Sequence, residues 1–141
     1  MELERTLVII KPDAVAARLI GEVIKRFEER DLEVIALKMV NLTKEEWGRF
    51  YQVHQDKPFY YDFIEFMSSG PSIVMVLQGE GVIMEARRLI GETDPKLARL
   101  GTIRGDYATD TRHNIVHGSD SRTTAEAEIS FFFKENELWS H

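Results

Sequence analysis

A histidine near the end of the chain stands where an imidazole could do chemistry. Residues 114–121 read NIVHGSDS, so His117 ends a short apolar run and directly precedes a glycine. Two hydroxyls and a carboxylate then follow within three positions (Ser119, Asp120 and Ser121). An imidazole in this setting can serve as a nucleophile, a base or a metal ligand. Residues elsewhere in the chain must decide between these roles.

Glu128 is a candidate partner for this imidazole. It falls in a predicted helix, from which its carboxylate could orient or polarise one ring nitrogen of His117. Gly118 permits a tight turn, and residues 119–121 supply hydrogen-bonding groups just before that helix begins. The alternative for Glu128 is a solvated place on the helix face, shared with Glu126.

Three cations are candidates for binding an anion: Lys11, Arg87 and Arg104. The chain has neither G-x-x-x-x-G-K-[ST] nor G-x-G-x-x-G, so side chains rather than a glycine-rich loop would have to hold a phosphate. Arginine suits this task because its planar fork grips two oxygens, while lysine acts as a point charge. The alternative is that all three are ordinary surface residues among the 18 lysines and arginines.

The other three histidines give no sign of a metal centre. No H-x-x-x-H or H-x-E spacing links His54, His113 or His141 to His117, so we expect no protein-built metal site. The chain has no cysteine, which excludes disulfides, thiolate zinc sites and cysteine nucleophiles. Histidine is therefore the obvious soft nucleophile.

Aromatic side chains offer a second kind of contact. Tyr51, Phe59 and Tyr60 fall in a predicted helical hairpin, and one exposed ring there could stack on a nucleobase. Such stacking accepts every base, because each base has a π-face. The alternative is that these rings belong to the hydrophobic core.

Composition indicates one ordered, soluble domain over residues 1–141. The chain is 43% hydrophobic and 30% charged, and we find no linker, repeat or low-complexity tract. No apolar run could span a bilayer, and the start MELER lacks the features of a secretory signal, so we expect a cytoplasmic protein without a membrane partner. The net charge of −6 argues against broad adhesion to nucleic acid or anionic lipid.

Hydrophobic patterns predict the elements that must position these residues. Short apolar or β-branched runs predict strands over residues 6–10, 32–42, 72–78 and 114–117. An apolar residue recurs every fourth position from Val15 to Phe27, which predicts a helix capped by Asp13. Two further helices, the first with a Thr43–Glu46 capping box, form the hairpin that ends at residues 68–71.

The second half of the chain adds two more helices and a long loop. Gly81 opens a helix that Gly91 ends, and another helix covers residues 123–133. Residues 92–111 show no sustained period and are predicted to form an ordered loop. Without the hairpin and the last helix the order is β-α-β-β-α-β. We therefore predict an α+β, ferredoxin-like fold whose four-stranded antiparallel sheet is covered by helices.

One conflict arises within the fourth predicted strand. Strict alternation puts His117 on the face of Ile115 and opposite Asn114. Both polar side chains can reach one site only if the strand twists or ends between them.

Five motifs together resemble the nucleoside diphosphate kinase family. They are IKPD at residues 10–13, SGP at 69–71, GET at 91–93, GTIRGD at 101–106 and NIVHGSDS at 114–121, in the family's order. The resemblance covers nearly the whole chain. It implies transfer of the γ-phosphate of a nucleoside triphosphate to a nucleoside diphosphate, by a ping-pong route through a phosphohistidine, which maintains (d)NTP pools.

The resemblance also implies a role for each matching residue. His117 would attack through Nδ1, while Glu128, and Ser119 acting through it, would hold the ring. Phe59 would stack on the base. Contacts to phosphates or sugar hydroxyls would come from Lys11, Tyr51, Arg87, Thr93, Arg104 and Asn114, with Lys11 and Asn114 on the ribose 3′ side.

Cofactor and partners follow from the same resemblance. Mg²⁺ would bridge phosphate oxygens and be held mainly by nucleotide and water. The substrates would be nucleotides such as ATP, GTP and GDP, and the chain would form a homo-oligomer, a tetramer or a hexamer.

The sequence departs from the family at Leu100, where proline is usual, and at residues 16–18. The family's tetramers and hexamers use the region of Leu100 and the tail after Trp139 differently, so both assemblies stay open at this point.

Two other functions are compatible with parts of the pattern. A nucleotide-sensing module on the same scaffold would bind without transfer, but a sensor has no need of the nucleophile His117. A sheet-based nucleic-acid binder is disfavoured by the net charge of −6 and by the lack of an aromatic RNA-binding strand. We therefore favour the kinase and expect no stable nucleic-acid partner.

Overall fold

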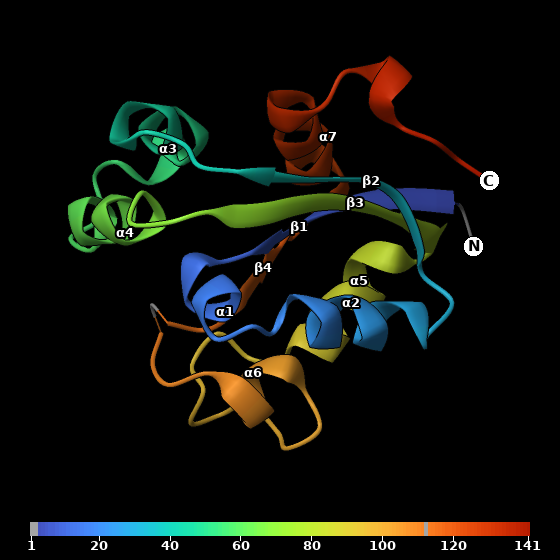
Figure 1. Ribbon diagram of the computed structural model, residues 1–141, viewed down its shortest axis with the longest axis horizontal. Coiled ribbons are helices and arrows are strands. Elements are labelled where there is room, and N and C mark those ends of the chain that lie inside the picture. The colour runs from blue at the N-terminus through green and yellow to red at the C-terminus, as the bar shows by residue number, and fades with distance from the viewer. Residues whose placement is uncertain (1–2, 112) are drawn as a thin grey trace.

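A four-stranded antiparallel sheet forms the centre of the molecule (Figure 1). The computed structural model describes residues 3–111 and 113–141. Residues 1–2, part of the start MELER, lie outside the described residues, as does residue 112 between the predicted loop and the fourth predicted strand. The sheet order is β2-β3-β1-β4, and all neighbours are antiparallel. The strands are β1 (Leu3–Ile10), β2 (Glu33–Val40), β3 (Ser72–Glu80) and β4 (Val116–Gly118).

Helices cover both faces of this sheet. They are α1 (Pro12–Ala16), α2 (Ile20–Glu28), α3 (Lys44–Phe50), α4 (Tyr60–Met67), α5 (Val82–Ile90), α6 (Ile103–Tyr107) and α7 (Arg122–Phe132), with 3₁₀ turns at Gln52–His54 and Glu135–Glu137. The predicted ferredoxin-like arrangement, with its inserted hairpin α3–α4 and terminal helix α7, is confirmed.

The two faces have separate cores because β1 is buried on both sides. Val8 and Ile10 pack with Phe27 and Ile103 between the sheet and a layer formed by α1, α2, α5 and α6. This layer lies below the sheet in Figure 1. Leu7 and Ile9 pack against the opposite layer of α3, α4 and α7, around the fully buried Trp47. A strand buried on both faces must be apolar at every position, which explains the continuous run LVII.

The first predicted helix is wrong in two respects. It divides into α1 and α2, and Arg18 between them has a left-handed backbone with φ of 62°. The N-cap is Lys11 rather than Asp13, because Pro12 takes the first helical position, which its fixed φ favours. The carboxylate of Asp13 instead accepts a hydrogen bond from the backbone N–H of Ile115 at 3.1 Å.

Residues 92–111 contain α6, which the sequence did not predict. This helix has five residues, too few to show a hydrophobic period. Its N-cap is Thr102, whose hydroxyl accepts the N–H of Gly105 at 3.0 Å. A Cβ at residue 105 would lie 1.9 Å from the carbonyl oxygen of Arg99, so only glycine fits there. Arg104 is therefore held in a defined turn.

The fourth strand begins at Val116, two residues later than predicted. Ile115 before it has a φ of 77°, and its carbonyl accepts the backbone N–H of Lys11 at 2.8 Å. This break in the extended backbone removes strict alternation between Asn114 and His117. Both side chains line the same cavity.

Candidate active site

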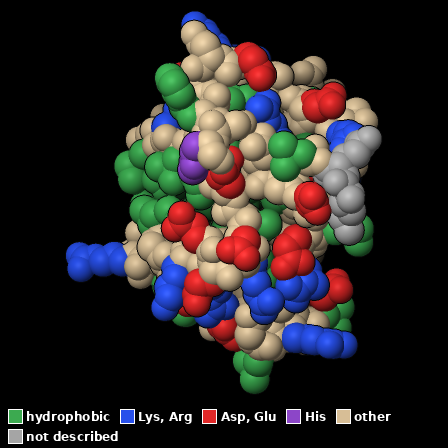
Figure 2. Space-filling model, turned by 90° about the vertical axis from the view of Figure 1, so that its right-hand side faces the viewer, with side chains coloured by type: hydrophobic (Ala, Val, Ile, Leu, Met, Phe, Trp, Pro, Cys, Tyr) green, Lys and Arg blue, Asp and Glu red, His purple; other side chains and the backbone are tan. Residues whose placement is uncertain are grey.

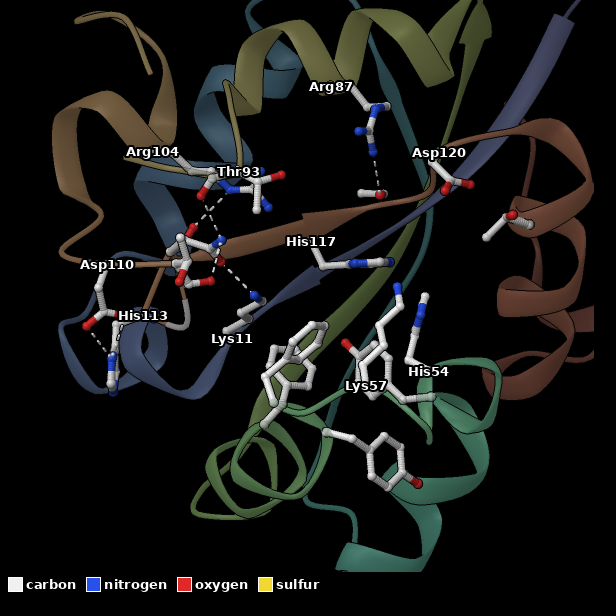
Figure 3. A pocket seen from close by; sticks show the side chains of 18 of the residues that line it. Lys11, His54, Lys57, Arg87, Thr93, Arg104, Asp110, His113, His117 and Asp120 are labelled. Carbon is white, nitrogen blue, oxygen red and sulfur yellow. Dashed lines mark hydrogen bonds and ion pairs between the residues drawn. The ribbon is translucent and has the colours of Figure 1, made fainter. Parts of the chain in front are cut away.

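A cavity of about 760 Å³ opens between the hairpin α3–α4, strand β4 and the segment that carries α6 (Figure 3). Nine of the ten predicted site residues line it, and the tenth, Ser119, contacts Glu128. The nine are Lys11, Tyr51, Phe59, Arg87, Thr93, Arg104, Asn114, His117 and Glu128. The structure thus brings together side chains that lie far apart in the sequence.

His117 lies in the middle of β4, paired with Ile9 of β1, and its imidazole points into the cavity (Figure 3). Its Nε2 lies 3.2 and 3.3 Å from the two carboxylate oxygens of Glu128 on α7. The hydroxyl of Ser119 donates to Glu128 at 2.6 Å and accepts the backbone N–H of Leu7 at 3.2 Å. A relay from backbone to hydroxyl to carboxylate therefore fixes the ring.

This relay also selects a tautomer. A carboxylate beside Nε2 favours the form in which Nε2 carries the proton, which leaves a lone pair on Nδ1. Within residues 3–111 and 113–141, Nδ1 of His117 takes part in no hydrogen bond. The nitrogen that could attack is thus the one that the relay does not occupy.

Lys11 brings a buried cation to the cavity. Its Nζ donates to the side-chain oxygen of Asn114 at 2.6 Å and lies 5.0 Å from the centroid of the Phe63 ring. Burial, assisted by the charge of Arg104 and opposed by Asp13, lowers the pKa of Lys11 from 10.5 to about 7. An anion in the cavity would favour the charged form of this lysine.

Arg104 and Arg87 approach the same region from two helices. Arg104 is 8% exposed, and its guanidinium donates to the carbonyls of Gly91, Asn114 and Val116 at 3.2, 3.4 and 2.8 Å. Burial, and then the charge of Arg87, lowers the pKa of Arg104 to about 10. Arg87 donates to the carbonyl of Gly118 at 3.3 Å.

Basic side chains gather in one cavity of an acidic protein. Acidic and basic side chains are interspersed on the face that carries both termini (Figure 2), and the whole chain has a net charge of −6. In contrast, Lys11, Arg87 and Arg104 converge around His117 (Figure 3). Such local convergence suits a small polyanion better than an extended one.

Aromatic rings form the outer part of the cavity. Phe59, immediately before α4, is 52% exposed, and Lys57 places its Nζ 5.8 Å from the centroid of that ring. Tyr51 is buried, which raises its pKa above the usual value, with a smaller contribution from Glu128. Its hydroxyl has no hydrogen-bond partner among the described residues. Phe59 offers a free π-face, and Tyr51 offers an unused polar group.

Several cavity residues had no role predicted from the sequence. They are His54, Lys57, Phe63, Asp110, Thr111, His113 and Thr124. Tyr60, named above as a candidate for stacking, and Asp120, named above beside His117, also line the cavity. His54 follows Tyr51 at helical spacing, so the prediction for Tyr51 could have been extended to it. His113 lies 3.0 Å from the carboxylate of Asp110, and both belong to an irregular segment whose sequence carries no positional signal. Across residues 3–111 and 113–141 there is no group of three or more His, Cys, Asp or Glu side chains that could hold a metal ion.

Sequence comparison identifies the family. A family model described as nucleoside diphosphate kinase matches residues 4–138. This chain belongs to the nucleoside diphosphate kinase family. The predicted resemblance is confirmed, and with it the prediction of an enzyme of the phosphotransferase class.

Individual relatives agree over nearly the full length. The chain is 54% identical to nucleoside diphosphate kinase 1 of Protochlamydia amoebophila over 138 residues, which cover 98% of each chain. It is 52% identical to the nucleoside diphosphate kinase of Desulfatibacillum aliphaticivorans, with 96% of this chain and 99% of the relative covered.

Solved structures confirm the fold. The Aquifex aeolicus nucleoside diphosphate kinase superposes with a TM-score of 0.94 at 41% identity, over 97% of this chain and 99% of that one. A halophilic nucleoside diphosphate kinase from Halobacterium salinarum, solved in complex with CDP, gives a TM-score of 0.95 at 39% identity. The superposition covers 99% of this chain and 93% of that one.

None of the helices formed by residues 3–111 and 113–141 is both long enough and apolar enough to cross a lipid bilayer.

Proposed function

We propose that this enzyme transfers the γ-phosphate of a nucleoside triphosphate to a nucleoside diphosphate by a ping-pong mechanism through His117. In the first half, Nδ1 attacks the γ-phosphorus, the bond to the β–γ bridging oxygen breaks, and the nucleoside diphosphate leaves. In the second half, a terminal phosphate oxygen of another nucleoside diphosphate attacks the phosphohistidine and regenerates the imidazole. Through this reaction the enzyme would maintain (d)NTP pools.

The observation that carries the proposal is the contact between Nε2 of His117 and Glu128. This contact holds the ring by one nitrogen and leaves the other facing a cavity lined by cations. The carboxylate also stabilises positive charge on the ring as the N–P bond forms. Ser119 acts as a positioning residue, because its hydroxyl fixes the carboxylate of Glu128.

Phosphoryl transfer needs an in-line geometry and compensation of charge on the transferring oxygens. Arg87 and Arg104 supply planar donors around the imidazole, and Lys11 adds a point charge that an anion would maintain. Tyr51 and Thr93 offer hydroxyls that line the same cavity. These residues would contact the phosphates or the sugar hydroxyls.

The remaining contacts would hold the nucleoside. Lys11 and Asn114 form a hydrogen-bonded pair that would bind on the ribose 3′ side. The exposed ring of Phe59 would stack on the base. Because a π-face reads no base edge, this arrangement predicts broad tolerance of ATP, GTP and other nucleotides.

Mg²⁺ fits this site as part of the substrate. Since the described residues form no cluster of acidic or histidine ligands, the ion would be held by nucleotide oxygens and water. When bound, it would offset negative charge on the phosphates. The protein would contribute the cations that surround those phosphates.

We further propose that residues 1–141 act as one domain within a cytoplasmic homo-oligomer, a tetramer or a hexamer. Strand β2 lies at the sheet edge and exposes the apolar side chains of Leu37 and Met39, which suits contact with a second copy. Light scattering would measure the assembly, and a monomer would contradict this part of the proposal.

A labelling experiment tests the reaction. Incubation with γ-labelled ATP and Mg²⁺ should give a protein-bound phosphate that is acid-labile, base-stable and transferable to added GDP. His117→Ala should abolish labelling and leave nucleotide affinity largely intact. A nucleotide sensor would bind without labelling, and an equal loss of affinity and transfer would contradict the role of His117 as nucleophile.

A further inference from the structure

A cluster of four side chains joins α2 to α6 outside the cavity. Arg26 of α2 donates through Nε to Glu22 at 2.8 Å, and its Nη1 lies 2.9 Å from the carboxylate of Asp106. Its Nη2 lies 3.5 Å from the hydroxyl of Tyr107, which donates to Glu22 at 3.4 Å. The guanidinium carbon also lies 5.1 Å from the centroid of the Tyr107 ring. One arginine thus contacts every other member of the cluster.

These contacts enclose Arg104 along the chain. Nη1 of Arg26 donates to the carbonyl of Gly101 at 3.4 Å, before α6, and pairs with Asp106 within it. The other carboxylate oxygen of Asp106 accepts the N–H of Gly101 at 2.8 Å. The Arg26 side chain therefore binds the turn that carries Arg104 on both sides of it.

Arg104 depends on the position of that turn. Its guanidinium must reach three carbonyls on other segments while it lines the cavity. A helix of five residues is marginal by itself, because forming the first turn orders several residues for a single hydrogen bond. Contacts with the rest of the protein must therefore set the orientation of α6.

The Arg26 contacts have the burial expected of a positioning device. The side chains of Arg26, Glu22 and Asp106 are 20%, 32% and 24% exposed, so water screens them less than a surface pair. The hydrogen bond from the N–H of Gly101 lowers the pKa of Asp106 below its usual value, and the contact with Arg26 lowers it by a smaller amount. Asp106 therefore remains ionised over the neutral pH range.

We propose that Arg26 is a positioning residue for phosphoryl transfer, which acts by fixing α6 and thereby the guanidinium of Arg104. The inference rests on the proposed function, because it assumes that Arg104 contacts the transferring phosphates. Arg26 itself is not a cavity-lining side chain among the described residues.

A double-mutant cycle between residues 26 and 104 tests the inference. Arg26→Met keeps the length of the side chain and removes its donors. We expect kcat/KM for phosphoryl transfer to fall about tenfold or more, since misplacement of a contact by ~1 Å can cost up to ~100-fold. In an Arg104→Ala background the same substitution should cost less than about twofold, because its target is gone.

Three further variants separate positioning from general stability. Arg88→Met removes an exposed pair with Glu85 on α5 and should leave transfer unchanged. Arg26→Lys keeps the charge without the planar fork and should restore part of the lost rate. Asp106→Asn keeps an acceptor for the N–H of Gly101 and should lower the rate of transfer less than Arg26→Met does. It can therefore replace Arg26→Met in the test if that variant folds poorly. Thermal unfolding identifies a temperature at which every variant assayed is folded.

Each outcome has a distinct meaning. An equal fold-loss from Arg26→Met with and without Arg104 would overturn the inference, because the cluster would then act on the fold in general. If Arg26→Met folds, an unchanged rate of transfer in this variant would also overturn the inference. If Arg26→Met does not fold, an unchanged rate in Asp106→Asn would overturn it. Absence of transfer by the unsubstituted enzyme would instead contradict the proposed function.

Discussion

The two sides of the cavity are built differently. His117 belongs to the backbone ladder between β1 and β4, and Glu128 stands on a helix of eleven residues. Arg104 belongs to a helix of five residues in a largely irregular segment, and single hydrogen bonds to three carbonyls hold its side chain. The proposed nucleophile is thus fixed by regular structure, whereas the proposed phosphate contact from Arg104 is fixed by a network of side-chain hydrogen bonds. Substitutions on the two sides should therefore have different kinetic signatures.

Apart from removal of the proposed nucleophile itself, the largest effect is expected on the irregular side. Arg104→Ala removes a preorganised donor and should lower kcat/KM about 10²- to 10³-fold, the usual cost of losing a group that stabilises transition-state charge. Nucleotide affinity should weaken as well, because the same guanidinium would contact bound phosphates. Steady-state kinetics and calorimetric titration measure both quantities. Arg99→Ala, an exposed arginine in the same segment, is the control and should change neither.

Substitutions on the sheet side should lower the rate of phosphoryl transfer without weakening nucleotide binding. Glu128→Gln removes the charge that orients His117 and should slow phosphorylation about 10- to 100-fold, the typical cost of losing a histidine's hydrogen-bonded partner. Nucleotide affinity should change little. Glu126→Gln on the exposed side of the same helix should behave as the unsubstituted enzyme. Loss of affinity equal to the loss of rate would remove the distinction between the two sides.

The smallest effect concerns stability and pH. The pKa of Lys11 is lowered from 10.5 to about 7, so between these values the unfolded chain binds a proton that the folded chain has released. The free energy of unfolding should therefore rise with pH in this window, by about 1 kcal/mol per pH unit from this group. Lys11→Met should flatten the rise. Denaturant unfolding at several pH values above neutrality tests this, and identical slopes in both proteins would contradict the lowered pKa.

Much of the sheet side of the cavity, where regular structure positions the residues, could be predicted from the sequence. Strand β3 is apolar from Ile73 to Leu77 because it is central, and the Thr43–Glu46 capping box forms as expected. The segment NIVHGSDS marks the imidazole and its surroundings by residue type alone. The structure brings the predicted site residues together, while their individual roles stay predictions.

The rest could not be predicted because it depends on contacts between distant residues. The break at Arg18 and the left-handed Ile115 use residue types that give no sign of positive φ. Helix α6 is too short to show a period. The Arg26 cluster joins two helices that are distant in sequence, and each of its residues alone resembles an ordinary polar or aromatic position on a helix. Only the folded chain reveals what they position.

The position of the phosphoryl group on the enzyme tests the central claim most directly. After reaction with ¹⁵N-histidine-labelled protein and ATP, nuclear magnetic resonance of the phosphoenzyme reports which ring nitrogen couples to phosphorus. We predict a single phosphohistidine at residue 117, bonded through Nδ1, with Nε2 still protonated beside Glu128. Phosphate on Nε2, or on any other residue, would contradict the account.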